Sequence, residues 1–301
     1  LQTDPELADV GAIVFDEFHE RHLAGDLGTA LALDVQHGLR EDLRLLVMSA
    51  TLDGERIAAW LDAPRISSPG RSFPVVIEYP PARRQESVEA HAARVVRQAL
   101  EDTVEGDVLV FLPGEREIRD THLHLSRRQY RHTEILPLYA RLSAKDQDRV
   151  FKPGPARRIV LATNVAETSL TVPRIRYVVD TGTARVKRYS QRSQLERLHV
   201  EPISQAAADQ RKGRCGRVGP GICIRLYGEE DYAARTRFTD PELLRSSLAN
   251  VILRMLSLKL GDVEAFPFLD MPEPRAIGDG YRRLAEVQAI DDNRRLTGLG
   301  R

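Results

Sequence analysis

The residues from Gln210 to Arg217, QRKGRCGR, place one glutamine, four cationic side chains and two glycines within eight positions. Arg211, Arg214 and Arg217 are three residues apart, so two or three guanidinium groups would project from one face if the segment is helical. Planar guanidinium groups at this spacing suit an anion with several oxygen atoms, above all a polyphosphate. A basic face for an RNA backbone, or a solvated run of charge, would have the same composition. By itself, the segment therefore leaves a nucleotide site and these alternatives open.

Two small residue types accompany the arginines. Gly213 and Gly216 carry no Cβ atom, which lets the backbone or a ligand approach closely. Cys215 has the residue type of a reactive thiol, but the interpretation we favour is a small residue that fills space. Because Cys215 and Cys223 are the only two cysteines of 301 residues, the sequence indicates a reducing compartment and no disulfide framework.

A pair of carboxylates follows the apolar segment GAIVF in the sequence DEFH, Asp16 to His19. Carboxylates at the carboxyl end of a strand lie where open α/β sheets bind their ligands. There Asp16 can hold Mg²⁺, usually through water, and Glu17 can polarise an attacking water molecule. An acidic loop is the alternative. The spacing of His19 and His22 differs from the HExxH pattern of zinc proteases, so no zinc site is expected.

Hydroxyl and amide side chains follow two further apolar segments. The sequence SAT places Ser49, Ala50 and Thr51 after RLLVM, where the hydroxyl groups could simply cap a helix. The sequence ATNVAETSLTVP, Ala162 to Pro173, is richer in such donors, which contact phosphate oxygens and sugars without reading bases. Its polar residues are Thr163, Asn164, Glu167, Thr168, Ser169 and Thr171.

The elements that position these residues alternate between strands and helices. Short apolar runs at 11–16 and 44–49 predict buried strands on either side of a helix at 26–39. After the Ser-, Pro- and Gly-rich linker at 67–74, a second series predicts helices at 86–101, 114–128 and 143–150 and strands at 107–112, 133–138, 157–163 and 175–180. This alternation predicts an α/β fold with parallel sheets.

In the remaining chain, apolar and polar residues alternate with other periods. Residues 184–203 alternate around a polar SQRSQ turn and predict a protruding antiparallel hairpin. Beyond Phe238 the pattern is helical, with Asp240 and Pro241 expected as N-cap and first helical residue. The apolar stripe that follows predicts a small, separate helical domain, and consists of Leu244, Leu248, Val251, Ile252, Met255 and Leu256.

The charge is balanced overall but not locally. Lys and Arg number 44, as do Asp and Glu, so a generic polycation is excluded. The stretch 174–217 nevertheless holds eleven basic and four acidic residues, which indicates a local site for a nucleic-acid backbone. No apolar run is long enough for a membrane span, and the first residues do not resemble a signal peptide. We expect a monomer in the cytoplasm.

Taken in order, these motifs resemble those of superfamily 2 helicases, and within them the DEAH-box RNA helicases of the bacterial HrpA/HrpB type. DEFH resembles the family's motif II, SAT motif III, VLVFLPG (108–114) motif IV, TNVAETSLTVP motif V and QRKGRCGR motif VI. The resemblance covers essentially the whole chain. It implies two RecA-like lobes, the first truncated, at 1–70 and 71–236, and a winged-helix-like domain with the start of a helical bundle at 237–301.

The resemblance also implies a role for each motif. ATP would lie between the lobes, with Asp16 on Mg²⁺, Glu17 on the attacking water, Gln210 near the γ-phosphate, and Arg214 and Arg217 as arginine fingers. His19 and the segment Ser49, Ala50 and Thr51 would couple nucleotide state to RNA. The RNA, free or in a ribosome or ribonucleoprotein, would contact Thr163, Asn164, Thr168, Ser169 and Thr171, and the hairpin would stand where its strands separate.

Two departures from the family pattern leave other functions open. The glycine-rich GKT phosphate loop is absent from the sequence, so we expect these 301 residues alone not to hydrolyse ATP, and a non-catalytic RNA-binding fragment is the alternative. Thr183 stands where many members carry a base-stacking aromatic residue, which predicts weak base selectivity. A DNA translocase is a third possibility, and the choice of RNA depends on the family resemblance.

Overall fold

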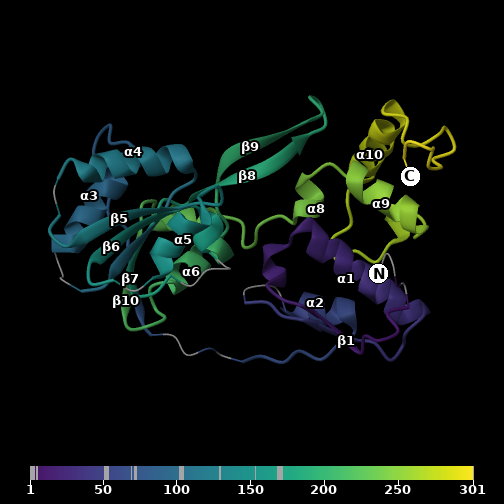
Figure 1. Ribbon diagram of the computed structural model, residues 1–301, viewed down its shortest axis with the longest axis horizontal. Coiled ribbons are helices and arrows are strands. Elements are labelled where there is room, and N and C mark those ends of the chain that lie inside the picture. Colours follow the sequence, from purple (N-terminus) through teal and green to yellow (C-terminus); the bar gives the residue numbers. More distant parts are fainter. Residues whose placement is uncertain are drawn as a thin grey trace. The chain divides into compact units, whose positions relative to one another are not determined.

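A computed structural model describes residues 4, 6–50, 54–68, 70, 73–101, 105–128, 130–152, 154–167 and 172–300. The chain forms two compact units (Figure 1). The first combines Leu1–Ser67, Lys187–Leu198 and Asp240–Arg301, and the second combines Ser68–Val186 and His199–Thr239. The division into domains at 1–70, 71–236 and 237–301 stays a prediction. None of the helices in the described ranges is long and apolar enough to cross a membrane.

The second unit is built on a six-stranded sheet in the order β3-β10-β7-β4-β6-β5. All of its strand pairs are parallel. The strands are β3 (Val75–Glu78), β4 (Asp107–Phe111), β5 (Thr133–Leu138), β6 (Arg157–Ala162), β7 (Ile175–Asp180) and β10 (Gly221–Arg225). The helices are α3 (Val88–Glu101), α4 (Glu115–Ser126), α5 (Ala144–Phe151), η2 (Asn164–Ala166), α6 (Gln205–Gly213) and α7 (Glu229–Ala234).

The apolar strand β4 shows why this sheet is stable. Val108 and Val110 pack with α3 and α4 in one buried cluster, while Leu109 and Phe111 pack with Val150 of α5 in another. Every residue of β4 is buried because successive side chains of a strand point to opposite faces and helices cover both. The predicted α/β fold with a parallel sheet is confirmed. The strands β3 and β10, which form the edge beyond β7, are not among the strands predicted from the sequence.

In the first unit, β1 (Ala12–Phe15) and β2 (Arg44–Val47) pair in parallel, and α1 (Leu23–Gly38) packs against them. The prediction that both strands are buried is wrong for one face of this pair: Val14 and Leu46 are about half exposed, at 52% and 50%. Side chains alternate between the faces, and the described residues cover the face that α1 contacts. The helix α2 (Gly54–Leu61) follows motif III.

The C-terminal residues of the first unit form α8 (Glu242–Arg245), α9 (Ala249–Leu258), η3 (Val263–Ala265) and α10 (Pro274–Glu286). The prediction of a helix that begins with Asp240 and Pro241 at its N-cap and first turn is wrong, because Pro241 is itself the N-cap of the short α8. The chain is extended at Ser246, and Ser247 Oγ accepts a hydrogen bond from the Ala249 amide at 3.4 Å. Serine side chains compete in this way with helix continuation.

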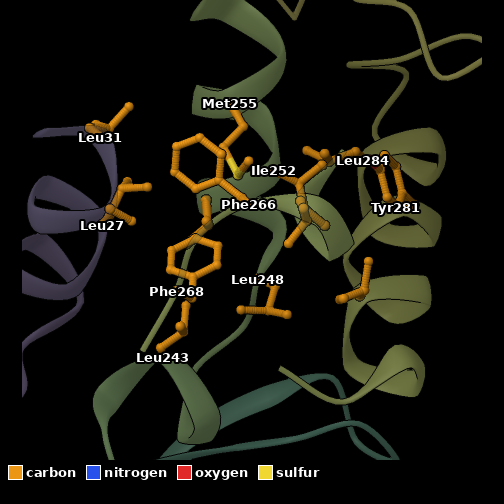
Figure 2. Close-up of a cluster of buried hydrophobic side chains, with 14 of the residues drawn as sticks. Leu27, Leu31, Leu243, Leu248, Ile252, Met255, Phe266, Phe268, Tyr281 and Leu284 are labelled. Atoms are coloured by element: carbon orange, nitrogen blue, oxygen red, sulfur yellow. The ribbon is translucent and has the colours of Figure 1, made fainter. Parts of the chain in front are cut away.

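The core of these helices includes α1. Figure 2 shows Leu27 and Leu31 of α1 on one side of Phe266 and Phe268, with residues of α9 and α10 on the other. The start of α1 is tied to the same region because the buried Arg21 donates to Asp26 at 2.8 Å and to Asp270 at 2.7 Å. Five of the six stripe residues share one cluster with α1, whereas Leu244 is exposed. The stripe therefore does not pack as a separate core.

The predicted hairpin is confirmed as β8 (Thr183–Ser190) and β9 (Leu195–Pro202), joined by a turn at 191–194. Its tip belongs to the first unit. There the Tyr189 hydroxyl donates to Asp279 Oδ2 of α10 at 2.6 Å, and the Arg283 guanidinium lies 5.1 Å from the Tyr189 ring centre. The tip is therefore held by a hydrogen bond and a cation–π contact.

Candidate functional site

Motif II follows β1 directly. Asp16 and Glu17 are both exposed, and the Glu17 amide donates to Asp16 Oδ1 at 2.7 Å. Glu17 adopts left-handed backbone angles, with φ 51° and ψ 33°. This conformation is unfavourable for a residue with a Cβ atom and tends to occur at functional sites. Both carboxylates thus lie at the carboxyl end of a strand, as the sequence predicts.

His19 connects motif II to motif III within the first unit. Its Nδ1 accepts a hydrogen bond from the Ala50 amide at 3.3 Å, and its Nε2 lies 3.1 Å from Glu17 Oε2. Because Nδ1 is the acceptor, a neutral ring carries its hydrogen on Nε2 and donates it to Glu17. The ring therefore orients the Glu17 carboxylate. Ser49 lies beside this contact, and Thr51 lies outside the described residues.

Motif V begins where β6 ends. Thr163 is half-buried, and Asn164 is exposed at the start of η2. These two predicted RNA contacts are therefore at the carboxyl edge of the sheet, where donors can reach a ligand. The other three, Thr168, Ser169 and Thr171, lie outside the described residues.

Motif VI divides its three arginines between two roles. Arg211 is fully buried, and its guanidinium contacts Asp180 Oδ1 at 2.7 Å and Glu167 Oε1 at 2.6 Å. It also donates to the Thr183 carbonyl at 3.2 Å. Arg211 therefore does not project towards an anion with the other two arginines, because its donors are used inside the fold.

Gln210, Arg214 and Arg217 remain as the candidate nucleotide contacts. Gln210 is half-buried in α6, Arg214 is 8% exposed at the C-cap of that helix, and Arg217 is exposed in the loop beyond it. These residues belong to the second unit, and Asp16, Glu17 and His19 belong to the first. That both sets act on one nucleotide stays a prediction.

The two glycines of motif VI differ. A Cβ atom on Gly216 would lie 2.8 Å from a Val75 methyl group and 3.0 Å from the Phe73 carbonyl oxygen, and the Phe73 amide donates to the Gly216 carbonyl at 2.9 Å. Only glycine fits this close approach of two backbones without a shift. A Cβ atom on Gly213 would meet nothing within 4 Å, so the surrounding protein does not require a glycine at this position.

Asp180 and Tyr227, which no sequence motif indicates, complete the buried cluster around Arg211. Asp180, at the end of β7, accepts hydrogen bonds from Arg211 and from the Tyr227 hydroxyl at 2.8 Å. Burial raises the pKa of Glu167, although Arg211 opposes the shift. Burial alone would lower the pKa of Arg211, but Glu167 and Asp180 outweigh it and raise this pKa. The one feature of the sequence that could have indicated Asp180 is its position directly after the apolar strand RIRYVV.

Cys215 of motif VI is buried, and its Sγ contacts the Lys212 carbonyl oxygen at 3.1 Å. Burial raises the pKa of Cys215 to about 11 and also raises that of Cys223. The interpretation of Cys215 as a residue that fills space is favoured over a reactive thiol, because the thiolate is the nucleophile.

The two thiols are therefore expected to resist labelling by Ellman's reagent in the native protein at pH 8. We expect the rate to be about 100-fold lower than in urea-unfolded protein, since burial suppresses both access and the thiolate. Absorbance at 412 nm measures the reaction. Rapid release of one equivalent from folded protein would show that one of the two sites is open and reactive.

An all-parallel sheet with polar residues after its strands and an arginine-rich helix end defines the second unit as a RecA-like helicase lobe. Residues 91–219 match the helicase conserved C-terminal domain. The whole chain is 50% identical to the ATP-dependent RNA helicase HrpA of Escherichia coli, covering 24% of that protein, and 48% identical to an HrpA homologue of Haemophilus influenzae, again covering 24%.

Over its whole length the chain is homologous to DEAH-box RNA helicases of the HrpA/HrpB type. Its similarity to HrpB of Escherichia coli is 41% identity over 98% of the chain and 37% of that protein. The crystal structure of Escherichia coli DExH-box NTPase HrpB superimposes with a TM-score of 0.90 over 99% of this chain and 37% of that one. The chain thus spans between a quarter and two fifths of the length of these relatives.

Proposed function

We propose that the protein is an ATP-dependent RNA helicase of the DEAH-box type, which couples ATP hydrolysis to movement along RNA or to strand separation. The observation that carries the proposal is the contact of His19 with both Glu17 and Ala50. It joins the carboxylate that would orient a water molecule to the segment that would transmit the nucleotide state. A protein that only binds RNA has no need for this arrangement.

The carboxylates of Asp16 and Glu17 have the chemistry needed to hold a magnesium ion with ATP. Asp16 offers an exposed hard oxygen ligand, and Mg²⁺ usually binds proteins through one or two carboxylates while keeping several water molecules. When bound, the ion would neutralise charge on the phosphates. Glu17 would then orient the attacking water, Gln210 would contact the γ-phosphate, and Arg214 and Arg217 would stabilise the charge on the transferring phosphoryl group.

RNA would contact Thr163 and Asn164, together with Thr168, Ser169 and Thr171. Hydroxyl and amide donors hold phosphate and sugar oxygens without reading bases, which suits movement along a strand. The hairpin tip, held by Tyr189 on α10, would stand at the point of strand separation. The proposal includes RNA in ribonucleoproteins such as the ribosome as substrate, and the cytoplasm as the compartment.

The test is steady-state ATP hydrolysis by a longer form of the protein that includes a phosphate-binding loop, with RNA, DNA or neither. We expect stimulation by RNA to exceed that by DNA. His19→Ala should lower the stimulated rate about 10- to 100-fold, because a misplaced Glu17 orients water poorly. His22→Ala is the matched control, since this exposed histidine lies three residues away and does not contact Glu17.

Three outcomes would contradict parts of this proposal, and they are distinct. RNA binding without ATP hydrolysis in the longer protein would support the non-catalytic alternative. Equal stimulation by DNA and RNA would support a translocase of another kind. ATP hydrolysis that is unchanged in His19→Ala would contradict the positioning role of His19 while leaving the helicase assignment in place.

A further inference from the structure

A basic cavity lies at the edge of the six-stranded sheet opposite to motif V. Its walls come from the ends of α3 and α4, the starts of β5 and β6, and the residue before β7, and its volume is about 520 Å³. In parallel strands the amino ends share one edge, whereas motif V follows the carboxyl end of β6. The charged side chains that line the cavity are Arg97, Arg128, Arg131, Arg157, Arg174 and Glu101.

Three of the arginines have a structural role there. Arg157 donates to the Gly106 carbonyl at 2.7 Å and to the Ala99 and Leu100 carbonyls at 3.4 Å, at the carboxyl end of α3. Arg97 donates to the His124 carbonyl of α4 at 3.4 Å. Helix carboxyl ends carry partial negative charge, which a guanidinium group offsets. Arg174 donates to the Gly154 carbonyl at 2.8 Å and lies 3.8 Å from Asp107 Oδ1. These contacts explain Arg157, Arg174 and part of Arg97, but not Arg128 or Arg131.

Arg128 and Arg131 keep donors for a ligand. Arg128 forms an ion pair with Glu101 at 2.9 Å, and both side chains are more than half exposed. Such pairs contribute little to stability, so Arg128 can exchange Glu101 for another anion. The exposed Arg131 side chain makes no hydrogen bond or ion pair with any residue of the described ranges. A guanidinium group has five N–H donors in a planar fork that matches phosphate oxygens.

Tyr130 adds a polar group that the fold leaves unused. Its ring packs beside Leu100 against the buried cluster of α3 and α4. Its hydroxyl is buried with the Arg97 guanidinium beside its oxygen, but it makes no hydrogen bond of normal geometry within the described residues. Burial of an unpaired hydroxyl is unfavourable, and buried polar groups are nearly always paired. Tyr130 lines the cavity, so a ligand oxygen there would satisfy it.

We propose that this cavity binds a small phosphate-bearing ligand of mononucleotide size. Phosphate oxygens would accept hydrogen bonds from Arg128 and Arg131, and Tyr130 would donate to an oxygen deeper in the cavity. Leu100 and Pro155 supply an apolar wall for the remainder of the ligand. The volume is within the range of small-molecule sites, which is about 300–1,000 Å³. A phosphate ligand of this size is chosen over an extended RNA because the basic residues surround one cavity.

Isothermal titration calorimetry of the 301-residue chain tests the proposal with cytidine monophosphate and inorganic triphosphate as probes. We expect both to bind, and the double variant Arg128→Glu with Arg131→Glu to weaken binding about 100-fold through loss of two charged hydrogen-bond donors. Arg119→Glu is the matched control, since this exposed arginine of α4 does not line the cavity. It should leave affinity unchanged.

Tyr130→Phe is a second variant, which removes one hydroxyl group and changes no charge. Because its hydroxyl makes no hydrogen bond of normal geometry within the described fold, removing it should not lower the urea midpoint, but it should weaken the binding of cytidine monophosphate several-fold. Undetectable binding at millimolar probe, or unchanged affinity in the double variant or in Tyr130→Phe, would overturn the proposal. So would triphosphate binding that is lost in Arg217→Ala but kept in the double variant, because motif VI would then be its site. Cavity-dependent binding of an eight-nucleotide RNA without binding of either small probe would replace the proposed ligand by a nucleic acid.

Discussion

Replacing Arg211 by methionine is expected to lower the free energy of unfolding by about 3–5 kcal/mol. The side chain is fully buried and is held between two carboxylates, Asp180 at 2.7 Å and Glu167 at 2.6 Å. Its guanidinium also lies 4.8 Å from the centre of the Phe111 ring. Methionine fills a similar volume but leaves both carboxylates buried without their cation, which is far more costly than losing an exposed ion pair.

Urea denaturation of the 301-residue chain, followed by circular dichroism, measures this loss. Arg217→Met is the matched control, because it makes the same substitution at an exposed arginine of the same motif. It should change stability by less than about 0.5 kcal/mol. A loss below about 1 kcal/mol in Arg211→Met would show that the buried carboxylates are neutral or hydrated without Arg211.

The effect of Arg211→Met should depend on pH. Burial already raises the pKa of Glu167 with Arg211 present, and removal of the cation raises it further. A carboxyl group whose folded pKa is raised favours folding most at pH values below its unfolded pKa, and this contribution is lost as the pH rises through the folded pKa. The stability deficit of the variant should therefore be larger at pH 8 than at pH 5, and a deficit that grows on acidification would contradict this account.

The buried Arg211 also shows what the sequence could and could not predict. The spacing of Arg211, Arg214 and Arg217 is regular, so residue type and position alone cannot separate a buried arginine from an exposed one. The difference comes from Asp180, which lies 31 residues earlier in the chain. Partners brought together by tertiary folding are not visible in a local pattern.

The strands show the same limit. The strands β5 and β7 were predicted with their observed bounds, since runs such as TEILPL and RIRYVVD are apolar and flanked by clear breaks. The strand β10 was missed because GICIR is short and follows Gly219 and Pro220. It is a strand because it pairs with β3 and β7, with Cys223 opposite Ile77 and Val178. Such pairing depends on segments almost 150 residues apart.

The second large effect is expected on catalysis. In a longer form of the protein that includes a phosphate-binding loop, Arg217→Ala should lower the RNA-stimulated rate of ATP hydrolysis by about 10³-fold or more. Arg217 is exposed beyond the end of α6, and Gly216 holds the preceding backbone against Phe73. A guanidinium group on this fixed loop would stabilise the charge that develops on the transferring phosphoryl group in the transition state, and would therefore raise the rate of hydrolysis.

The pattern of kinetic changes distinguishes this role from simple ATP binding. An arginine that acts on the transition state lowers kcat and kcat/KM together, whereas one that only binds ATP raises KM with kcat unchanged. We therefore expect kcat to fall while ADP affinity changes little, because ADP lacks the γ-phosphate.

Lys212→Ala is the control within motif VI, since this side chain pairs with Asp209 at 3.2 Å. Because Arg217 is exposed, its replacement should leave the urea midpoint in place, so lost activity could not be assigned to unfolding. Unchanged ATP hydrolysis with RNA would remove Arg217 from the catalytic residues and leave Arg214 as the only candidate finger among the described arginines of the motif.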